Sequence, residues 1–180
     1  MSKLLGAVAA FVVLSTGLGF AQGPGGPPKP SPEQKRLGYF VGTWHNDGEI
    51  KPNGFMPAGK MTGDSTCTWF EGGFAVVCNS TGMSPMGPTK EIGILGYSSE
   101  EKVYTYAGVD NSPMSMTSVP KGTVEGGKWT YTDESKMGGK MVKSRYLINE
   151  TSPTSYTFRM EMLDDKGAWQ TIMDGTSTKK

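Results

Sequence analysis

Residues 156–162 read YTFRMEM, and this stretch decides the fold class. Its apolar side chains alternate with polar ones, which is the period of a half-buried β-strand. Residues 164–167, DDKG, have the composition of a tight turn, and a second strand is predicted over 168–177. The stretch therefore predicts an antiparallel hairpin with one apolar face and one charged face.

The second strand of this hairpin divides in the same way as the first. One face would carry Trp169, Thr171 and Met173, and the other Gln170 and Asp174. Such a division suits a single-layer wall with two different environments on its sides. Alternation does not say which face points inward, and the sequence leaves this open.

The same pattern extends over the chain from Gly42 onward. Glycine recurs every few residues, and no segment shows the three- and four-residue apolar spacing of a helix. The predicted strands are 42–50, 60–71, 74–82, 89–97, 102–109, 113–119, 128–134, 140–149, 154–163 and 168–177. Short connections make consecutive strands antiparallel neighbours. The sequence predicts an all-β, up-and-down barrel of about ten strands, with a two-sheet sandwich as the alternative.

The N-terminal part is organised differently. Residues 1–21 combine Lys3, an apolar run and a small-residue cleavage pattern, which is typical of a secretory signal peptide. An uncleaved anchor is the alternative. Residues 22–31 form a Pro/Gly-rich linker, and Ser31 would cap one short helix at the start of the barrel domain, residues 32–180. We therefore expect an exported protein, periplasmic or extracellular.

The two cysteines lie on either side of a hairpin signal. Gly72-Gly73 is a two-residue turn pattern, and pairing residue 71 with 74 places Cys67 opposite Cys78. Facing residues of antiparallel strands are about 4.5–5.5 Å apart, which is within the disulfide range. We predict a cross-strand disulfide, with a pair of buried thiols as the alternative.

The charge balance limits the class of partner. Without the predicted leader, the mature chain has 159 residues. One of the 18 basic residues lies in the leader, so the mature chain carries 17 basic and 17 acidic residues. Nucleic-acid binding as a main function requires clustered Lys and Arg, and this sequence contains no basic run. We expect no nucleic-acid partner and no stable membrane insertion of the mature chain. The oligomeric state is left open.

Several stretches resemble known barrels. The Gly-x-Trp pattern at 42–44 is similar to the opening of calycin barrels such as lipocalins, fatty-acid-binding proteins and nitrobindins. An ordered set more closely resembles a bacterial domain-of-unknown-function family, number 1579, of calycin-like barrels. That set is 33–37 (EQKRL), 40–44 (FVGTW), 96–98 (GYS), 156–162, Trp169 and 173–176 (MDGT). The resemblance implies this fold and an exported protein, without an assigned activity.

The residues that could contact a ligand are mainly aromatic, thioether and arginine side chains. In fatty-acid-binding barrels an interior Arg with a nearby Tyr holds a carboxylate. By that resemblance Arg145 or Arg159 would act with Tyr131 or Tyr146, whereas an outward Arg paired with Glu161 is the alternative. For Trp44 we favour a role in packing the barrel floor against the helix. The ligand-binding candidates are Trp44, Arg145, Tyr146, Phe158, Arg159, Met160, Met162 and Trp169.

The sequence predicts no catalytic set, no metal site and no cofactor. His45 and Asp47 share a strand face but lack an activated nucleophile. The phosphate-loop-like matches at 54–60 and 122–128 lack both a Ser or Thr after the Lys and a following helix. Two cysteines and one histidine cannot supply four soft zinc ligands.

Haem and copper remain secondary hypotheses. Trp44 and His45 face opposite ways on one strand, which argues against haem ligation of the nitrobindin kind. The pairs Met114/Met116 and Met160/Met162 could offer thioethers to Cu(I), although methionine more often fills an apolar wall.

We therefore expect a non-enzymatic barrel that binds a small apolar or amphipathic molecule. The main alternative is a packed structural or interaction barrel that contacts a partner through loops 51–60 and 83–89. A hydrolase or isomerase, or a Cu(I)-binding protein, ranks below both.

Overall fold

The computed structural model describes residues 26, 28–112, 118–137 and 139–180. The predicted leader and half of the predicted linker (residues 22–25 and 27) lie outside these residues. Within them, no helix has both the length and the apolar character needed to cross a membrane.

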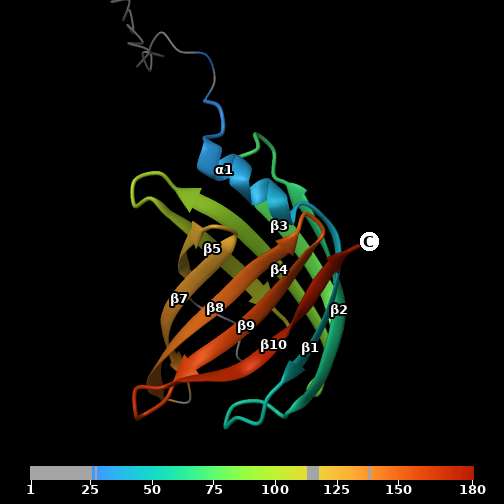
Figure 1. Ribbon diagram of the computed structural model, residues 1–180, viewed down its shortest axis with the longest axis vertical. Helices are drawn as coiled ribbons and strands as arrows, with labels where there is room; N and C mark the ends of the chain where they lie inside the picture. Colours follow the sequence, from blue (N-terminus) through green and yellow to red (C-terminus); the bar gives the residue numbers. More distant parts are fainter. Residues whose placement is uncertain (1–25, 27, 113–117, 138) are drawn as a thin grey trace, which may run out of the picture.

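Ten antiparallel strands close into one barrel (Figure 1). Each strand pairs with its neighbours in the chain, and β10 closes the barrel against β1. The strands are β1 (Gly42–Ile50), β2 (Gly59–Trp69), β3 (Val76–Ser84), β4 (Gly87–Ser98), β5 (Val103–Asp110), β6 (Lys121–Glu125), β7 (Lys128–Met137), β8 (Lys140–Ser152), β9 (Ser155–Leu163) and β10 (Trp169–Lys179). The predicted up-and-down barrel is confirmed, and the sandwich alternative is wrong.

One short helical segment precedes the barrel, as predicted. It consists of α1 (Pro32–Arg36) and the 3-10 turn η1 (Leu37–Phe40). The backbone N–H of Gln34 donates to the Ser31 hydroxyl at 3.2 Å, and the Ser31 N–H donates to the Gln34 side chain at 2.8 Å. This reciprocal capping box satisfies two backbone donors that the helix itself cannot pair.

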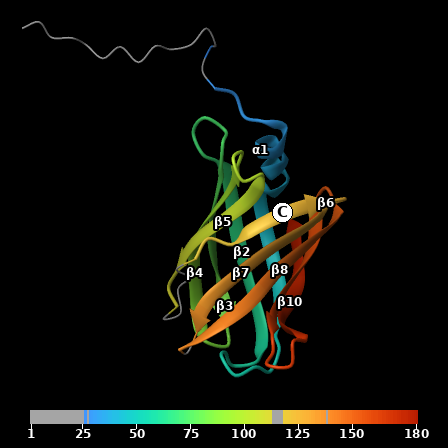
Figure 2. The same cartoon turned by 90° about the vertical axis from the view of Figure 1, so that its left-hand side faces the viewer.

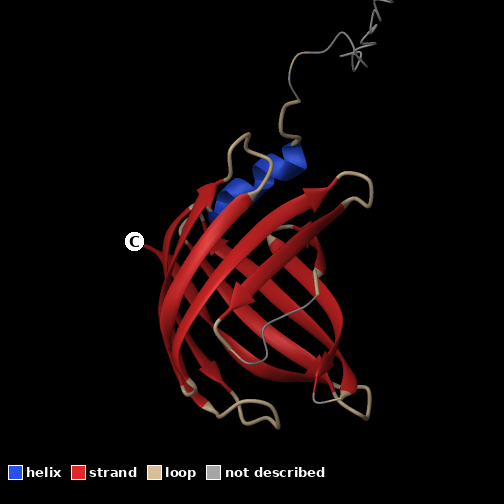
Figure 3. Ribbon diagram, turned by 180° about the vertical axis from the view of Figure 1, so that it is seen from behind, coloured by secondary structure: helices blue, strands red, loops and turns tan. Residues whose placement is uncertain are grey.

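The helical segment lies across one end of the barrel, which we call the helix end (Figure 3). The chain ends there too, next to the start of β1 (Figure 2), where the Lys180 N–H donates to the Thr43 carbonyl at 2.9 Å. The opposite end, which we call the loop end, carries the β1–β2 and β9–β10 connections. The two ends of the interior therefore differ in what covers them.

The predicted disulfide is present between Cys67 and Cys78. The two residues are cross-strand partners, as counting outward from Gly72-Gly73 predicted. The turn itself is wider than expected, because the ladder stops at the Trp69–Val76 pair. Both glycines have positive φ, 88° and 74°, which is why this turn requires glycine.

The sixth strand is the one misplaced element. We predicted it at 113–119, but the structure has β6 at Lys121–Glu125; residues 113–117 lie outside the described part. Gly126 and Gly127, both at positive φ, form the turn into β7, so the strand runs directly up to them. Position 122 within this strand is a glycine because the Tyr131 ring lies on it: an added Cβ would be 2.6 Å from that ring.

The predicted face of β10 also needs correction. The register shifts between Thr171 and Met173, so the two residues do not share a face. Met173 pairs with Met160 and Thr171 pairs with Glu161. Met160 and Glu161 are adjacent on β9 and therefore face opposite sides of the barrel wall. A bulge adds one residue to the strand, and a period of two cannot anticipate that shift.

Candidate functional site

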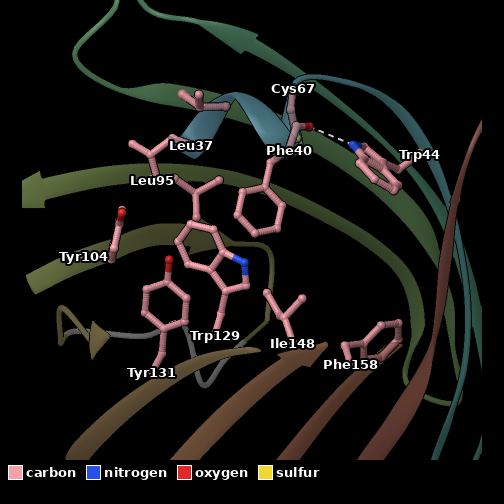
Figure 4. Close-up of a cluster of buried hydrophobic side chains, with 11 residues drawn as sticks. Leu37, Phe40, Trp44, Cys67, Leu95, Tyr104, Trp129, Tyr131, Ile148 and Phe158 are labelled. Carbon is pink, nitrogen blue, oxygen red and sulfur yellow. Dashed lines mark hydrogen bonds between the residues drawn. The ribbon is translucent and has the colours of Figure 1, made fainter. Parts of the chain in front are cut away.

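The helix end of the barrel is filled by a solid aromatic plug (Figure 4). Trp44 and Trp129 are 1% and 0% exposed, and their rings pack with Phe40 and the surrounding tyrosines. The indole N–H of Trp44 donates to the Phe40 carbonyl at 2.7 Å. The expected packing of Trp44 between the barrel floor and the helical segment is confirmed.

Glu150 fastens this plug from the barrel side. One of its oxygens accepts from the Arg36 guanidinium at 2.5 Å and from the Trp129 indole N–H at 2.6 Å. The Tyr39 hydroxyl also donates across the same end, to the Ser155 carbonyl at 2.8 Å. Burial raises the pKa of Tyr39 to about 12, and the nearby Glu150 charge adds to that effect. A ligand therefore cannot use the helix end without displacing this network.

Because Trp44 points inward, alternation along each strand identifies the remaining inward side chains. They include a row of small polar groups on neighbouring strands. The Ser177 hydroxyl donates to the Asn46 side-chain oxygen, the Asn46 amide donates to the Ser65 hydroxyl at 3.0 Å, and Ser65 hydrogen-bonds Ser80 at 2.9 Å. Tyr156 hydrogen-bonds Ser177 from the other side. We call these five residues the polar belt.

A carboxylate continues the belt on the next strand. Glu91 on β4 is the cross-strand partner of Ser80, and it accepts a hydrogen bond from the Tyr106 hydroxyl on β5. Asp110, its partner on β5, faces the same side. Burial raises the pKa of Glu91, and the charge of Asp110 raises it further. Polar groups thus follow seven consecutive strands, from β9 through β10 and β1 to β5.

The wall across the barrel from Ser65, Ser80 and Glu91 is apolar. Phe158 is buried, while Tyr146, Met160 and Met173 point inward from β8, β9 and β10 and are half-buried. Burial raises the pKa of Tyr146 well above its usual value, with smaller contributions from the charges of Tyr156 and Glu91. Tyr146, Met160 and Met173 retain some solvent exposure although they point inward. Side chains therefore fill the loop end less completely than the helix end.

Paired inward glycines thin the wall on six strands. Phe158 lies over the Gly48–Gly175 pair, where an added Cβ on Gly175 would be 2.4 Å from its ring. At the Gly63–Gly82 pair, the three atoms nearest to a Cβ on Gly63 are all backbone. Aromatic rings thus cover two of the three pairs, since Tyr106 lies over Gly93–Gly108, whereas the backbone forms the nearest surface at Gly63–Gly82.

Three of the ligand-binding candidates lie on the outer face. The Arg145 Nε donates to Glu161 at 2.5 Å, and its guanidinium lies 4.3 Å from the Trp169 ring centre. Arg159 lies 3.6 Å from the other Glu161 oxygen and is exposed. Glu161 is only 5% exposed beneath them. The expected alternative of an outward Arg paired with Glu161 therefore describes both arginines.

The other five candidates are inward. Tyr146, Phe158, Met160 and Met162 line the apolar wall, and Trp44 belongs to the plug. The structure thus brings four of the eight predicted residues together around the loop-end half of the interior. Met114 and Met116 lie outside the described residues.

His45 lies on the outer face of β1 between two carboxylates. Its Nδ1 is 2.8 Å from Asp64, and its Nε2 is 3.3 Å from Asp47. Among the described residues, no group of three or more His, Cys, Asp or Glu side chains is arranged to hold a metal ion. His45 therefore does not face the space in which a barrel ligand would bind.

Tyr131 carries an unpaired hydroxyl. It is the one buried side-chain oxygen or nitrogen in the described part of the chain without a hydrogen-bond partner. Burial raises the pKa of this phenol, with a smaller contribution from Tyr104. Its ring belongs to the buried core cluster, and its cross-strand partner is the inward Tyr146.

Sequence reasoning missed the polar belt entirely. Asn46, Ser65, Ser80 and Ser177 are ordinary polar residues in strands, and nothing local distinguishes them from solvent-facing ones. The available signal was strand alternation, because each of these residues stands an even number of positions from an inward residue on its own strand. Asn46, for example, is two residues from Trp44, and Ser65 is two residues from Cys67. That signal becomes usable once one inward residue is known on every strand.

Comparison with solved structures supports the fold. The S-type phycobiliprotein lyase CPES from Guillardia theta is similar with a TM-score of 0.55 and 13% identity, over 81% of this chain and 90% of that one. Rv2717c from M. tuberculosis is similar with a TM-score of 0.55 and 12% identity, over 84% and 99%. At such low identity these likenesses describe the fold alone.

No curated protein matches the chain in sequence. A family model does match, over residues 29–179, which includes the helical segment and all ten strands. The expected family is thereby confirmed, and the chain belongs to the family described as "Protein of unknown function (DUF1579)".

Proposed function

We propose that this protein is an exported barrel that binds one small amphipathic molecule in the loop-end half of its interior. The observation that carries this proposal is the division of that interior into two sides. Ser65, Ser80 and Glu91 on β2 to β4 form the polar side, and Phe158, Met160 and Tyr146 on β8 and β9 form the apolar side. A few polar anchors in a mainly apolar hollow are the usual composition of a small-molecule site.

The asymmetry of the barrel supports the same function. A barrel built for stability alone would gain from filling both ends with apolar side chains. Here the helix end is filled with apolar side chains, while inward polar groups farther along the strands hydrogen-bond one another. Buried networks of this kind are retained where they add specificity or function, because they add little stability.

Export is proposed on two observations. The leader-like composition of residues 1–21 is one, and the Cys67–Cys78 disulfide is the other. Disulfides persist mainly in oxidising compartments outside the cytoplasm.

The test is native mass spectrometry of the protein exported by its own leader, followed by titration with the neutral dye N-phenyl-1-naphthylamine. Ser65→Phe places a ring in the interior, whereas Thr66→Phe, on the adjacent outward position, is the matched control. We expect a bound mass that leaves on unfolding and at least tenfold weaker dye binding in Ser65→Phe alone. Equal dye binding by both variants, or none by the native protein, would overturn the proposal.

A second function is favoured by exposed apolar side chains in the β1–β2 loop and around the β3–β4 turn; of the predicted loop 83–89, only residues 85 and 86 lie outside β3 and β4. Phe55, Met83 and Met86 are all exposed there. Surface apolar groups near one another are typical of protein contacts. If the barrel acts as an interaction module, Phe55→Ser with Met86→Ser will abolish capture of an exported partner and leave dye binding unchanged.

A further inference from the structure

We infer that the ligand presents a hydrogen-bond donor to Glu91, best a protonated amine, and that its apolar body lies against Phe158 and Met160. This inference rests on the proposed function and specifies the ligand class for the same interior. It is the opposite of the carboxylate ligand that the arginines suggested in the sequence.

The sign of charge inside the barrel carries the inference. Three acidic side chains point inward outside the plug: Glu91 on β4, Asp110 on β5 and Asp133 on β7. Glu91 faces Asp110 across one ladder, and Asp133 accepts from the Ser118 hydroxyl at 2.8 Å. The potential in the middle of the interior is therefore negative, and a low-dielectric wall strengthens it.

The basic side chains do not balance this charge. On the described strands, alternation points only two of them inward: Lys179, whose ammonium lies 4.8 Å from the Trp44 ring in the plug, and Lys140, exposed at the rim. Arg145 and Arg159 are on the outer face with Glu161. A carboxylate ligand would find acceptors and like charge at Glu91, whereas an ammonium would find a charged acceptor.

The neighbourhood of Glu91 suits an ammonium in a second way. The Tyr106 hydroxyl already donates to one Glu91 oxygen, which holds the carboxylate in place. The Tyr106 ring lies on Gly93, where an added Cβ would be 2.6 Å from its hydroxyl, and it therefore lies flat on the wall beside Glu91. Aromatic faces attract cations, so a charged head at Glu91 gains a second favourable contact.

The belt extends the same preference. Asn46, Ser65 and Ser80 offer side-chain oxygens on the strands leading to Glu91. Hydroxyls can accept from further donors on the ligand. A ligand with an ammonium and one or two hydroxyl or amide groups along one edge would fit both Glu91 and this row.

The experiment compares three probes that share an eight-carbon chain: octylammonium, octanol and octanoate. Each is titrated into the wild-type protein by calorimetry at pH 7 and low salt. We expect octylammonium to bind at least tenfold more tightly than octanoate, with octanol between them. Octanoate binding as tightly as octylammonium would overturn the inference and leave the proposed function intact. Absence of binding by all three probes and by the neutral dye would overturn both.

Variants then assign the preference to one residue. Glu91→Gln keeps the size and an acceptor for Tyr106 but removes the charge, and it should bring octylammonium and octanoate within about threefold of each other. Glu134→Gln, which removes an outward carboxylate paired with Lys143, is the matched control and should keep the preference. A preference that survives in Glu91→Gln would contradict the assignment.

Discussion

The most informative perturbation of the polar belt is Ser177→Ala. Ser177 is fully buried, and its hydroxyl joins Tyr156 on one side to Asn46 on the other. Asn46 is half-buried and can replace the lost bond with water. Tyr156 is also half-buried, but its ring packs against Phe40 and Trp44, and it loses the hydroxyl that offsets part of its burial. Leaving one buried hydroxyl unpaired costs about 1–3 kcal/mol.

We therefore expect Ser177→Ala to reduce the free energy of unfolding by about 2 kcal/mol, and Tyr156→Phe to reduce it by about as much. For a domain of this size, that loss lowers Tm by about 4–8 °C. The double variant removes both partners at once, and no hydroxyl is then left unpaired. Its loss should be about 1–2 kcal/mol smaller than the sum of the two single losses.

The assay is urea unfolding followed by tryptophan fluorescence and far-ultraviolet circular dichroism. An unchanged m-value would show that the variants alter stability and not the extent of unfolding. Thr178→Ala, an outward neighbour on β10, serves as the control and should change stability by less than about 0.5 kcal/mol. Strictly additive losses in the double variant would refute the reasoning, because they would mean that the two hydroxyls do not depend on each other.

Three further predictions follow from single features. Replacing Cys67 and Cys78 with alanine opens a loop of 11 residues and should lower the free energy of unfolding by about 3 kcal/mol, measured in urea against the oxidised protein; an equal midpoint would contradict it. Burial raises the pKa of Glu91, so the folded state holds that proton more tightly than the unfolded chain, and wild-type stability falls as pH rises from the unfolded pKa through the folded one. Glu91→Gln should therefore be more stable than wild type at pH 7, with the gap closing near pH 4 in urea titrations; a constant gap would count against a titrating Glu91. Arg159→Ala should leave dye affinity within about twofold, because the side chain is 53% exposed on the outer face.

The fold was predictable because its signals are redundant. Alternation, glycine turns and the helix cap each specify the same antiparallel path, and an error in one leaves the others intact. The misplaced sixth strand shows this: the next strand begins at Lys128 as predicted, and only the strand before Gly126-Gly127 was shifted. The hairpin register around Gly72-Gly73 was likewise correct, although the turn was wider.

The site was less predictable because it depends on one binary choice per strand. In β8, Arg145 and Tyr146 are adjacent, and only the closed barrel decides which of them lies inside. Amphipathic arginines can cover aromatic surface on the outside as well as bind ligands within, as Arg145 does over Trp169. A charged residue among aromatic ones therefore does not identify an interior anchor.

The placement of the two charge types explains why the interior has specificity to offer. On the outer face, Arg145 and Arg159 neutralise Glu161, so this buried carboxylate is already satisfied and contributes to the wall. Inside, Glu91 has a hydroxyl donor and an acidic neighbour, and no basic side chain of β3 to β5 points inward. In a barrel that keeps its arginines outside and a carboxylate inside, folding does not supply the inner carboxylate with a positively charged partner. A cationic ligand would supply it, and binding would then be coupled to the charge state of this one residue.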